Sequence, residues 1–155
     1  MSDVNLTVTN NGVSLALTAL IDRGRSMQSF LNRNIYRIYQ NAQRTRWMTE
    51  NESEGGRWKG LNAKYERYKR KRFASYEGAG TKMLIATNRL YKSVIGPGNG
   101  QRKIVTNSSM VISTNVGYAK YVDDARSFST WGPEFRAKIK QSIGDFIMYN
   151  IQRGE

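Results

Sequence analysis

The chain has no cysteine and no histidine among its 155 residues. Without cysteine, disulfides, thiol catalysis and cysteine-ligated metals are excluded. Without histidine, the commonest general base and the commonest metal ligand of proteins are missing. Because few routes to enzymatic chemistry remain, we expect a protein that is not an enzyme and that needs no cofactor.

Long apolar runs are also missing. No stretch of about eighteen apolar residues occurs, which argues against a membrane span. The first ten residues, MSDVNLTVTN, lack a basic region followed by an apolar core, so we expect no signal peptide. An apolar content of 39% is typical of a folded domain. We therefore expect one domain over residues 1–155, in which residues 1–16 form a strand or an arm.

Acidic residues are few, since 12 of them face 25 basic residues and the formal net charge is +13. A pI near 10.2 indicates an acidic partner: nucleic acid, an anionic membrane or an acidic protein surface. The charge is concentrated in residues 57–72, which hold eight basic residues and one acidic residue. The same segment contains an apolar stripe at helical spacing, which predicts packing against the core as well: Trp58, Leu61, Tyr65 and Tyr68.

The N-terminal half is predicted to be mainly helical. Residues 4–17 alternate apolar and polar side chains around Asn10-Asn11-Gly12, which predicts a hairpin, or one strand followed by entry into a helix. From about residue 17 to 48 the period becomes 3.6, with Arg33, Arg37 and Arg44 opposite an apolar face. That face comprises Leu20, Met27, Leu31, Ile35, Ile38 and Ala42. A second, basic helix is expected from its N-cap Asn62 to about Phe73.

The C-terminal half is predicted to contain the sheet and a final helix. Residues 82–94 fit either a helix or a turn leading into a strand, and residues 103–106 and 110–115 form a hairpin. We expect a turn at residues 118–122 and an edge strand at 126–131. Pro133 and Glu134 begin the last helix, and its buried face is Phe135, Ile139, Ile143 and Phe146. The fold class is therefore α+β, with a small antiparallel sheet packed against a long N-terminal helix and a C-terminal amphipathic helix, and a short basic helix between them.

Catalytic or metal-binding patterns are weak. Lys92-Ser93 is a formal Ser–Lys pair, but such pairs are commonplace in a chain rich in both residues. Asp123-Asp124 is expected to be a solvated turn, because further acids at defined spacing are lacking. Glu50, Glu52 and Glu54 are expected to form an exposed loop without the oxygens of a calcium-binding loop. Residues 78–82 lack the spacing of a phosphate-binding loop.

The order of the motifs resembles that of the tail-completion, or virion morphogenesis, proteins of tailed bacteriophages of the Mu-like and P2-like group. Trp58-Lys59-Gly60-Leu61 followed by the basic run is similar to the Trp-x-x-Leu and basic helix of that family. Residues 83–93 are similar to its Thr-Gly-x-Leu element with a serine three residues on. Asn88 stands in place of the usual glycine, and because asparagine tolerates a positive φ we expect the turn to survive. Residues 111–119 and Arg126-Ser127-Phe128 complete the match.

The resemblance implies a non-enzymatic virion protein, assembled in the host cytoplasm, that forms a ring at the head–tail junction. The expected partners are further copies of itself, as a hexamer, and the tail-tube and head-side connector proteins, with non-specific contact to genomic DNA in the channel and no membrane. The candidate contact residues are Arg33, Arg37, Arg44, Arg57, Lys59, Lys64, Arg67, Arg70 and Lys71. From the residues alone, a stand-alone nucleic-acid-binding protein is the second hypothesis.

Overall fold

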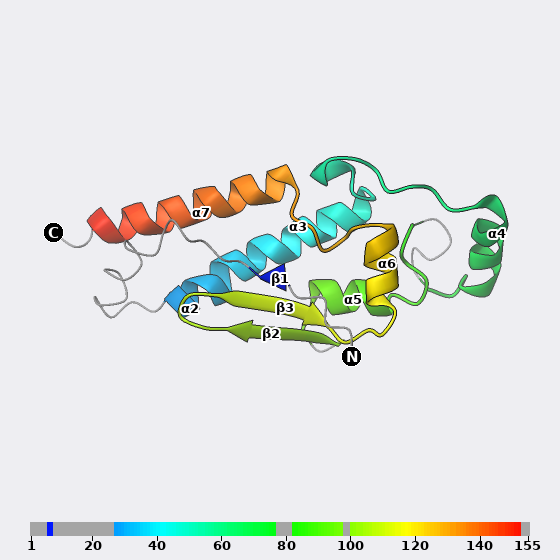
Figure 1. Ribbon diagram of the computed structural model, residues 1–155, viewed down its shortest axis with the longest axis horizontal. Helices are drawn as coiled ribbons and strands as arrows, with labels where there is room; N and C mark the ends of the chain where they lie inside the picture. Colours follow the sequence, from blue (N-terminus) through cyan, green and yellow to red (C-terminus); the bar gives the residue numbers. More distant parts are fainter. Residues whose placement is uncertain (1–5, 8–26, 77–81, 98–99, 153–155) are drawn as a thin grey trace.

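The computed structural model describes residues 6–7, 27–76, 82–97 and 100–152 (Figure 1). Of the predicted N-terminal hairpin, only the strand β1 (Leu6–Thr7) falls within these residues. The rest of that prediction, Leu20 on the first helix and the glycines of the 78–82 segment lie outside the described part of the chain.

The long N-terminal helix is confirmed from its first described residue. It consists of α2 (Met27–Phe30), a π-helical turn η1 (Leu31–Ile35) and α3 (Tyr36–Met48). Its predicted face is buried at Met27, Leu31 and Ile35 and partly buried at Ile38 and Ala42. The apolar periodicity therefore located the core-facing side correctly, whereas the π-helical turn has no signature in that pattern.

In the described part of the chain, the sheet consists of three antiparallel strands in the order β1-β3-β2. Strands β2 (Gln101–Val105) and β3 (Met110–Thr114) form the predicted hairpin, in which Val105 pairs with Met110. Burial alternates along β3, with Met110, Ile112 and Thr114 buried, as expected for a strand with one face on the core. The short β1 strand pairs with the other edge of β3.

Two predicted segments are wrong. The expected turn at 118–122 is part of a helix, α6 (Ala119–Ala125), and residues 126–131 form no strand. The second error has a physical reason: the carbonyl groups of Ser127, Phe128 and Thr130 accept hydrogen bonds from the buried Arg46 guanidinium instead of from a neighbouring strand. The ambiguous segment at 82–94 ends in a helix, α5 (Arg89–Ile95).

The helices and the sheet form layers around one core. Helix α7 (Pro133–Gln152) runs beside α2 and α3, and the sheet and α5 lie on the other side of that long helix (Figure 1). Phe30 stacks on Phe146 of α7 at 4.1 Å between ring centroids. Phe135 and Ile139 are buried and Ile143 and Phe146 are partly buried, as predicted for α7. The predicted α+β class, with a small antiparallel sheet against two long helices, is confirmed.

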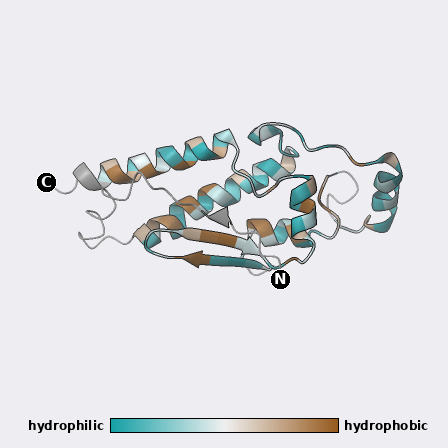
Figure 2. Ribbon diagram, viewed as in Figure 1, coloured by the Kyte–Doolittle hydropathy of each residue, from teal (hydrophilic) through white to brown (hydrophobic). Residues whose placement is uncertain are grey.

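The basic helix α4 (Ala63–Arg72) stands apart from these layers. It lies at one end of the molecule, beyond the short 3-10 helix η2 (Glu52–Glu54) and the extended residues 57–62 (Figure 1). Figure 2 colours α4 almost wholly hydrophilic, whereas β3 carries a strongly hydrophobic band. Its surface is therefore chemically unlike that of the elements that form the core.

Candidate functional site

Contacts within residues 62–72 stabilise the helix α4. Asn62 has an extended N-cap conformation, and its side chain accepts a hydrogen bond from the Lys64 amide, as predicted. Glu66 and Arg70 form an ion pair at 2.6 Å one turn apart. Four basic residues occupy the last turn, where they complement the negative end of the helix dipole. These local contacts matter because ten residues form only a marginal helix by themselves.

The predicted buried stripe on this segment is partly wrong. Trp58 is buried and Leu61 is partly buried, but Tyr65 and Tyr68 are 48% and 54% exposed. A different stripe, with a spacing of four residues, faces the molecule: Leu61, Tyr65, Lys69 and Phe73. Periodicity alone missed it because lysine is counted as polar, although its long aliphatic stem can cover apolar surface.

Lys69 is the buried residue of α4, at 2% exposure. Its ammonium group donates a hydrogen bond to the Lys82 carbonyl oxygen. Burial lowers the pKa of the Lys69 amine below its ordinary value, and the nearby carboxylates of Glu50 and Glu66 oppose that shift. Lys69 therefore ties α4 to the segment that leads into α5, a role that the sequence did not indicate.

The nine predicted contact residues fall into two groups. Arg33 lies on η1, and Arg37 and Arg44 lie on α3, all three exposed. The other six lie on residues 57–71: Arg57, Lys59, Lys64, Arg67, Arg70 and Lys71. The structure thus does not gather all nine on one element.

Two of the six cations have acidic partners. Arg57 pairs with the buried Glu50 carboxylate at 2.6 Å, and Arg70 pairs with Glu66. Within the described ranges, Lys59, Lys64, Arg67 and Lys71 form no salt bridge and are exposed. Of the six predicted contact residues on this segment, these four are therefore available for an acidic partner.

Aromatic side chains accompany these cations. The rings of Tyr65 and Tyr68 lie 6.1 Å apart, Tyr68 meets Phe73 edge-on at 6.4 Å, and Phe73 lies 6.5 Å from Tyr76. The Arg72 guanidinium lies 5.9 Å from the centroid of the Phe73 ring. Tyrosine and arginine together are enriched at the energetic centres of protein interfaces. This group was not expected, because the helical spacing of Tyr65 and Tyr68 predicts that both pack in the core.

A cleft of about 370 Å³ separates α4 from the body. One wall is the Leu61–Phe73 stripe of the α4 segment, a second is residues 84–90, and a third is Tyr118, Val122 and Arg126 on and beside α6. Leu84 and Asn88 in the second wall have φ of +61° and +60°. Asn88 thus has the left-handed conformation expected from its place in the motif. For a leucine that conformation is rare and costs on the order of 1–3 kcal/mol.

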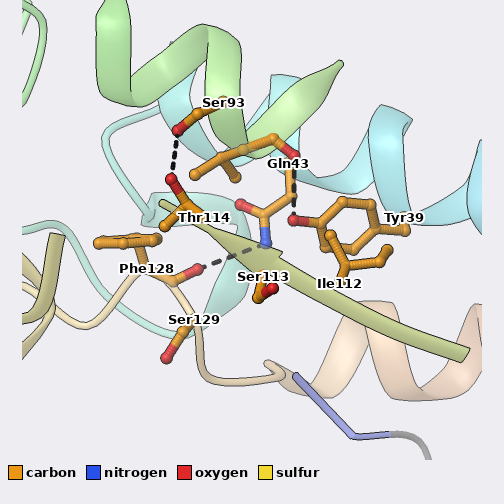
Figure 3. Close-up of a pocket in the computed structure, with 9 residues that line it drawn as sticks. Tyr39, Gln43, Ser93, Ile112, Ser113, Thr114, Phe128 and Ser129 are labelled. Atoms are coloured by element: carbon orange, nitrogen blue, oxygen red, sulfur yellow. Dashed lines mark hydrogen bonds between the residues drawn. The ribbon is translucent and has the colours of Figure 1, made fainter. Parts of the chain in front are cut away.

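A second, much smaller cavity lies inside the core (Figure 3). It measures about 20 Å³, room for one water molecule. Ser93 lines it, fully buried, with its hydroxyl 2.7 Å from both the Leu90 carbonyl oxygen and the Thr114 hydroxyl. Lys92 is exposed and does not line the cavity. Ser93 therefore ties α5 to β3, and the geometry gives no support to a Ser–Lys nucleophile.

The candidate carboxylates also have structural contacts. Asp123 accepts hydrogen bonds from the Phe128 and Ser129 amides, both at 2.8 Å, and so is not the solvated side chain that was expected. Glu50 is 5% exposed and accepts the Met83 amide at 3.0 Å, so the expectation of an exposed acidic loop is wrong at this residue. Over the described residues, no three acidic side chains gather as a metal site would require.

The described helices include none with both the length and the apolar character of a bilayer span. Comparison of the chain with known protein families, with curated proteins and with solved structures finds no match. The functional assignment therefore depends on the residues and on their geometry.

Proposed function

We propose that this chain is a non-enzymatic assembly protein of a tailed-phage virion, which forms a ring at the head–tail junction and uses α4 to contact its neighbours. The main support for this proposal is the exposed surface of α4. Helix α4 stands at the end of the molecule and displays exposed cations and tyrosines that the core does not need. A folded domain gains little stability from such a helix, so its surface is best explained by a partner.

The motif order described above supplies the virion context. The Asn88 turn has the positive φ that the family's glycine would allow, so this departure is compatible with the motif. Ser93 at the end of that motif is buried, which is consistent with a structural role. A closed ring requires a contact between two different patches on adjacent copies. The two groups of cations, on η1 and α3 and on residues 57–71, are separate surfaces, and each would need an acidic patch on the neighbouring molecule.

Electron microscopy of the purified protein, alone and mixed with its tail tubes, tests this proposal. We expect closed rings that cap the tube ends, and native mass spectrometry should show one dominant oligomer. A protein that remains monomeric in both settings and leaves tube ends bare would refute the assignment.

A stand-alone nucleic-acid-binding protein is the second candidate. The exposure of Tyr65 and Tyr68 beside unpaired cations favours it, because aromatic side chains can stack on bases while cations contact phosphates. This candidate predicts a monomer that binds DNA with micromolar affinity and a steep salt dependence. Titration of labelled DNA at several salt concentrations, together with the mass measurement, separates the two candidates.

A further inference from the structure

The cleft beneath α4 combines an apolar lining with positive charge. Leucine, valine and aromatic side chains line it on all three walls, including Leu61, Leu84, Phe73 and Val122. Its volume of about 370 Å³ is within the ~300–1,000 Å³ range of ligand pockets. Because its walls come from three separate segments, the cleft is a concave feature of the tertiary structure and not a gap within one loop.

The charged side chains that line the cleft, among the described residues, are all positive. Lys69, Arg89 and Arg126 line it, and no aspartate or glutamate does so among the described residues. The three cations differ in depth, since Lys69 is buried, Arg126 is half-buried and Arg89 is exposed. Arg126 donates to the Lys59 and Gly60 carbonyl oxygens and forms no salt bridge in the described part of the chain, nor does Arg89. The cleft thus presents the positive charge of Arg89 and Arg126, which no salt bridge of the described residues neutralises, beside apolar surface.

We propose that this cleft binds a short peptide segment of a partner protein, in which large apolar side chains stand next to aspartate or glutamate. The apolar side chains would fill the space between Leu61, Leu84 and Val122, and the carboxylates would pair with Arg89 and Arg126. The lining residues account for both contributions to binding. Burial of apolar surface supplies affinity, and charge complementarity selects acidic segments.

Nucleic acid fits this cleft less well than a peptide does. A nucleic-acid strand presents phosphates along its whole length, whereas most of this lining is aliphatic or aromatic. The exposed cations best placed for phosphates, Lys64, Arg67 and Lys71, do not line the cleft. The cleft and the outer face of α4 are therefore separate surfaces, and the peptide site does not depend on ring formation.

Binding of three sets of short fluorescein-labelled peptides to the full chain, measured by anisotropy, tests the site. The first set alternates Leu or Phe with Glu or Asp, the second replaces the acids with Gln or Asn, and the third replaces the apolar residues with Ser. We expect micromolar binding for the first set and affinities at least about tenfold weaker for the others. Equal binding by the second or third set, or no binding by any peptide of the first, would overturn the proposal.

Matched variants locate the site. Arg89→Glu should weaken binding by about tenfold or more, whereas Lys64→Glu, with the same change in net charge outside the cleft, should weaken it by about twofold at most. Ala86→Phe should fill the cleft and weaken peptide binding without changing the charge. Tyr118→Ser removes a half-exposed ring from the lining, so it should also weaken binding while having little effect on folding. Thermal unfolding checks that each variant is folded.

Equal losses in Arg89→Glu and Lys64→Glu would show general charge attraction and overturn the site. A labelled oligonucleotide whose binding falls in both Arg89→Glu and Ala86→Phe, while the acidic–apolar peptides show no such dependence, would assign the cleft to nucleic acid and also overturn it.

Discussion

Trp58 joins the charged segment to the core. Its ring is 6% exposed, lies 5.7 Å from the ring of Trp47, and donates its indole N–H to the Ser127 carbonyl oxygen at 3.2 Å. Replacement by alanine would leave a cavity beside Trp47 and remove one of the two donors to the Ser127 carbonyl oxygen. We expect Trp58→Ala to lower the free energy of unfolding by about 3–5 kcal/mol, measured by urea denaturation. Tyr68→Ala, at a half-exposed ring nearby, should change it by less than about 0.5 kcal/mol.

Arg46 is a buried charged residue on α3, at 4% exposure. Its guanidinium donates to Asn51 and to the carbonyl oxygens of Ser127, Phe128 and Thr130. We expect Arg46→Ala to lower the free energy of unfolding by roughly 3 kcal/mol or more, because the carbonyl groups of residues 127–130 lose a charged donor that bonds to three of them at once. Arg46→Lys should restore little of the lost free energy of unfolding relative to Arg46→Ala, since an ammonium group lacks the planar fork of donors of a guanidinium.

The exposed neighbour Arg44 provides the control for Arg46. Arg44→Ala should leave the free energy of unfolding within about 0.5 kcal/mol of the wild type. A wild-type stability for Arg46→Ala would mean that residues 126–131 keep their shape without this guanidinium.

Glu50 makes stability depend on pH in the acidic range. Burial acts to raise the pKa of its carboxyl, but the Met83 amide, Arg57 and Lys82 outweigh burial, so the pKa lies below the ordinary value of 4.5. A carboxyl with a lowered folded-state pKa stabilises the fold above its unfolded-state pKa, and this contribution disappears as the pH falls through the folded-state pKa.

We therefore expect the wild type to lose stability below about pH 4.5, and Glu50→Gln to lose less over the same range. Urea denaturation at neutral and at acidic pH measures both changes. Glu52→Gln, at an exposed side chain of the same loop, should retain the wild-type pH dependence. An identical acid response in the wild type and in Glu50→Gln would show that other carboxylates dominate.

At the scale of elements, α4 depends on its own sequence more than the other helices do. Its N-cap, its dipole-matched last turn and its buried Lys69 hold it, and it lies away from the layers of the core. A helix of this kind opens locally before the whole molecule unfolds. Such independence suits a contact element, because its surface can change without disturbing the core.

The N-cap of α4 can be tested directly. We expect Asn62→Ala to destabilise the helix by about 1 kcal/mol, because the Lys64 amide loses its acceptor. Hydrogen exchange should show faster exchange for the amides of α4 and little change in β3 or α7. Asn62→Asp keeps a capping oxygen and should preserve the wild-type protection. Uniformly faster exchange across the molecule would instead mean that α4 unfolds together with the core.

At the scale of the whole molecule, the unpaired cations of α4 are expected to carry assembly. The triple change Lys64→Glu, Arg67→Glu and Lys71→Glu should leave the melting temperature nearly unchanged, because all three side chains are exposed. It should strongly reduce ring formation and the joining of tails to heads, since charge complementarity with the partner is reversed.

The control for this variant has the same net charge. Reversal of three other exposed cations, Lys120, Arg136 and Lys140, should leave assembly close to wild type. Equal losses in both triple variants would point to a general effect of net charge and would remove α4 from the interface.

Much of the fold could be predicted because it depends on local periodicity. The apolar faces of the long helix and of α7, the hairpin of β2 and β3, and the Asn62 cap each follow from spacing along a few turns or one strand pair. The exposure of Lys64, Arg67 and Lys71 was predictable for the same reason. The aromatic group and the cleft were not, because both depend on which side of α4 turns toward a distant segment.

Composition and short-range pattern are enough to predict the α+β class, the strong positive charge and its concentration in residues 57–72. The burial of Lys69, the exposure of Tyr68 and the bonds from Arg46 to the carbonyl groups of residues 127–130 depend instead on how the folded chain packs. The physical reason is common to both cases. A long cationic side chain can bury its stem and satisfy its charged end with carbonyl groups, and where those carbonyl groups lie depends on the packing of segments far apart in the chain. The charged segment at 57–72 is thus an outward surface on one side and, through Lys69, part of the folded body on the other.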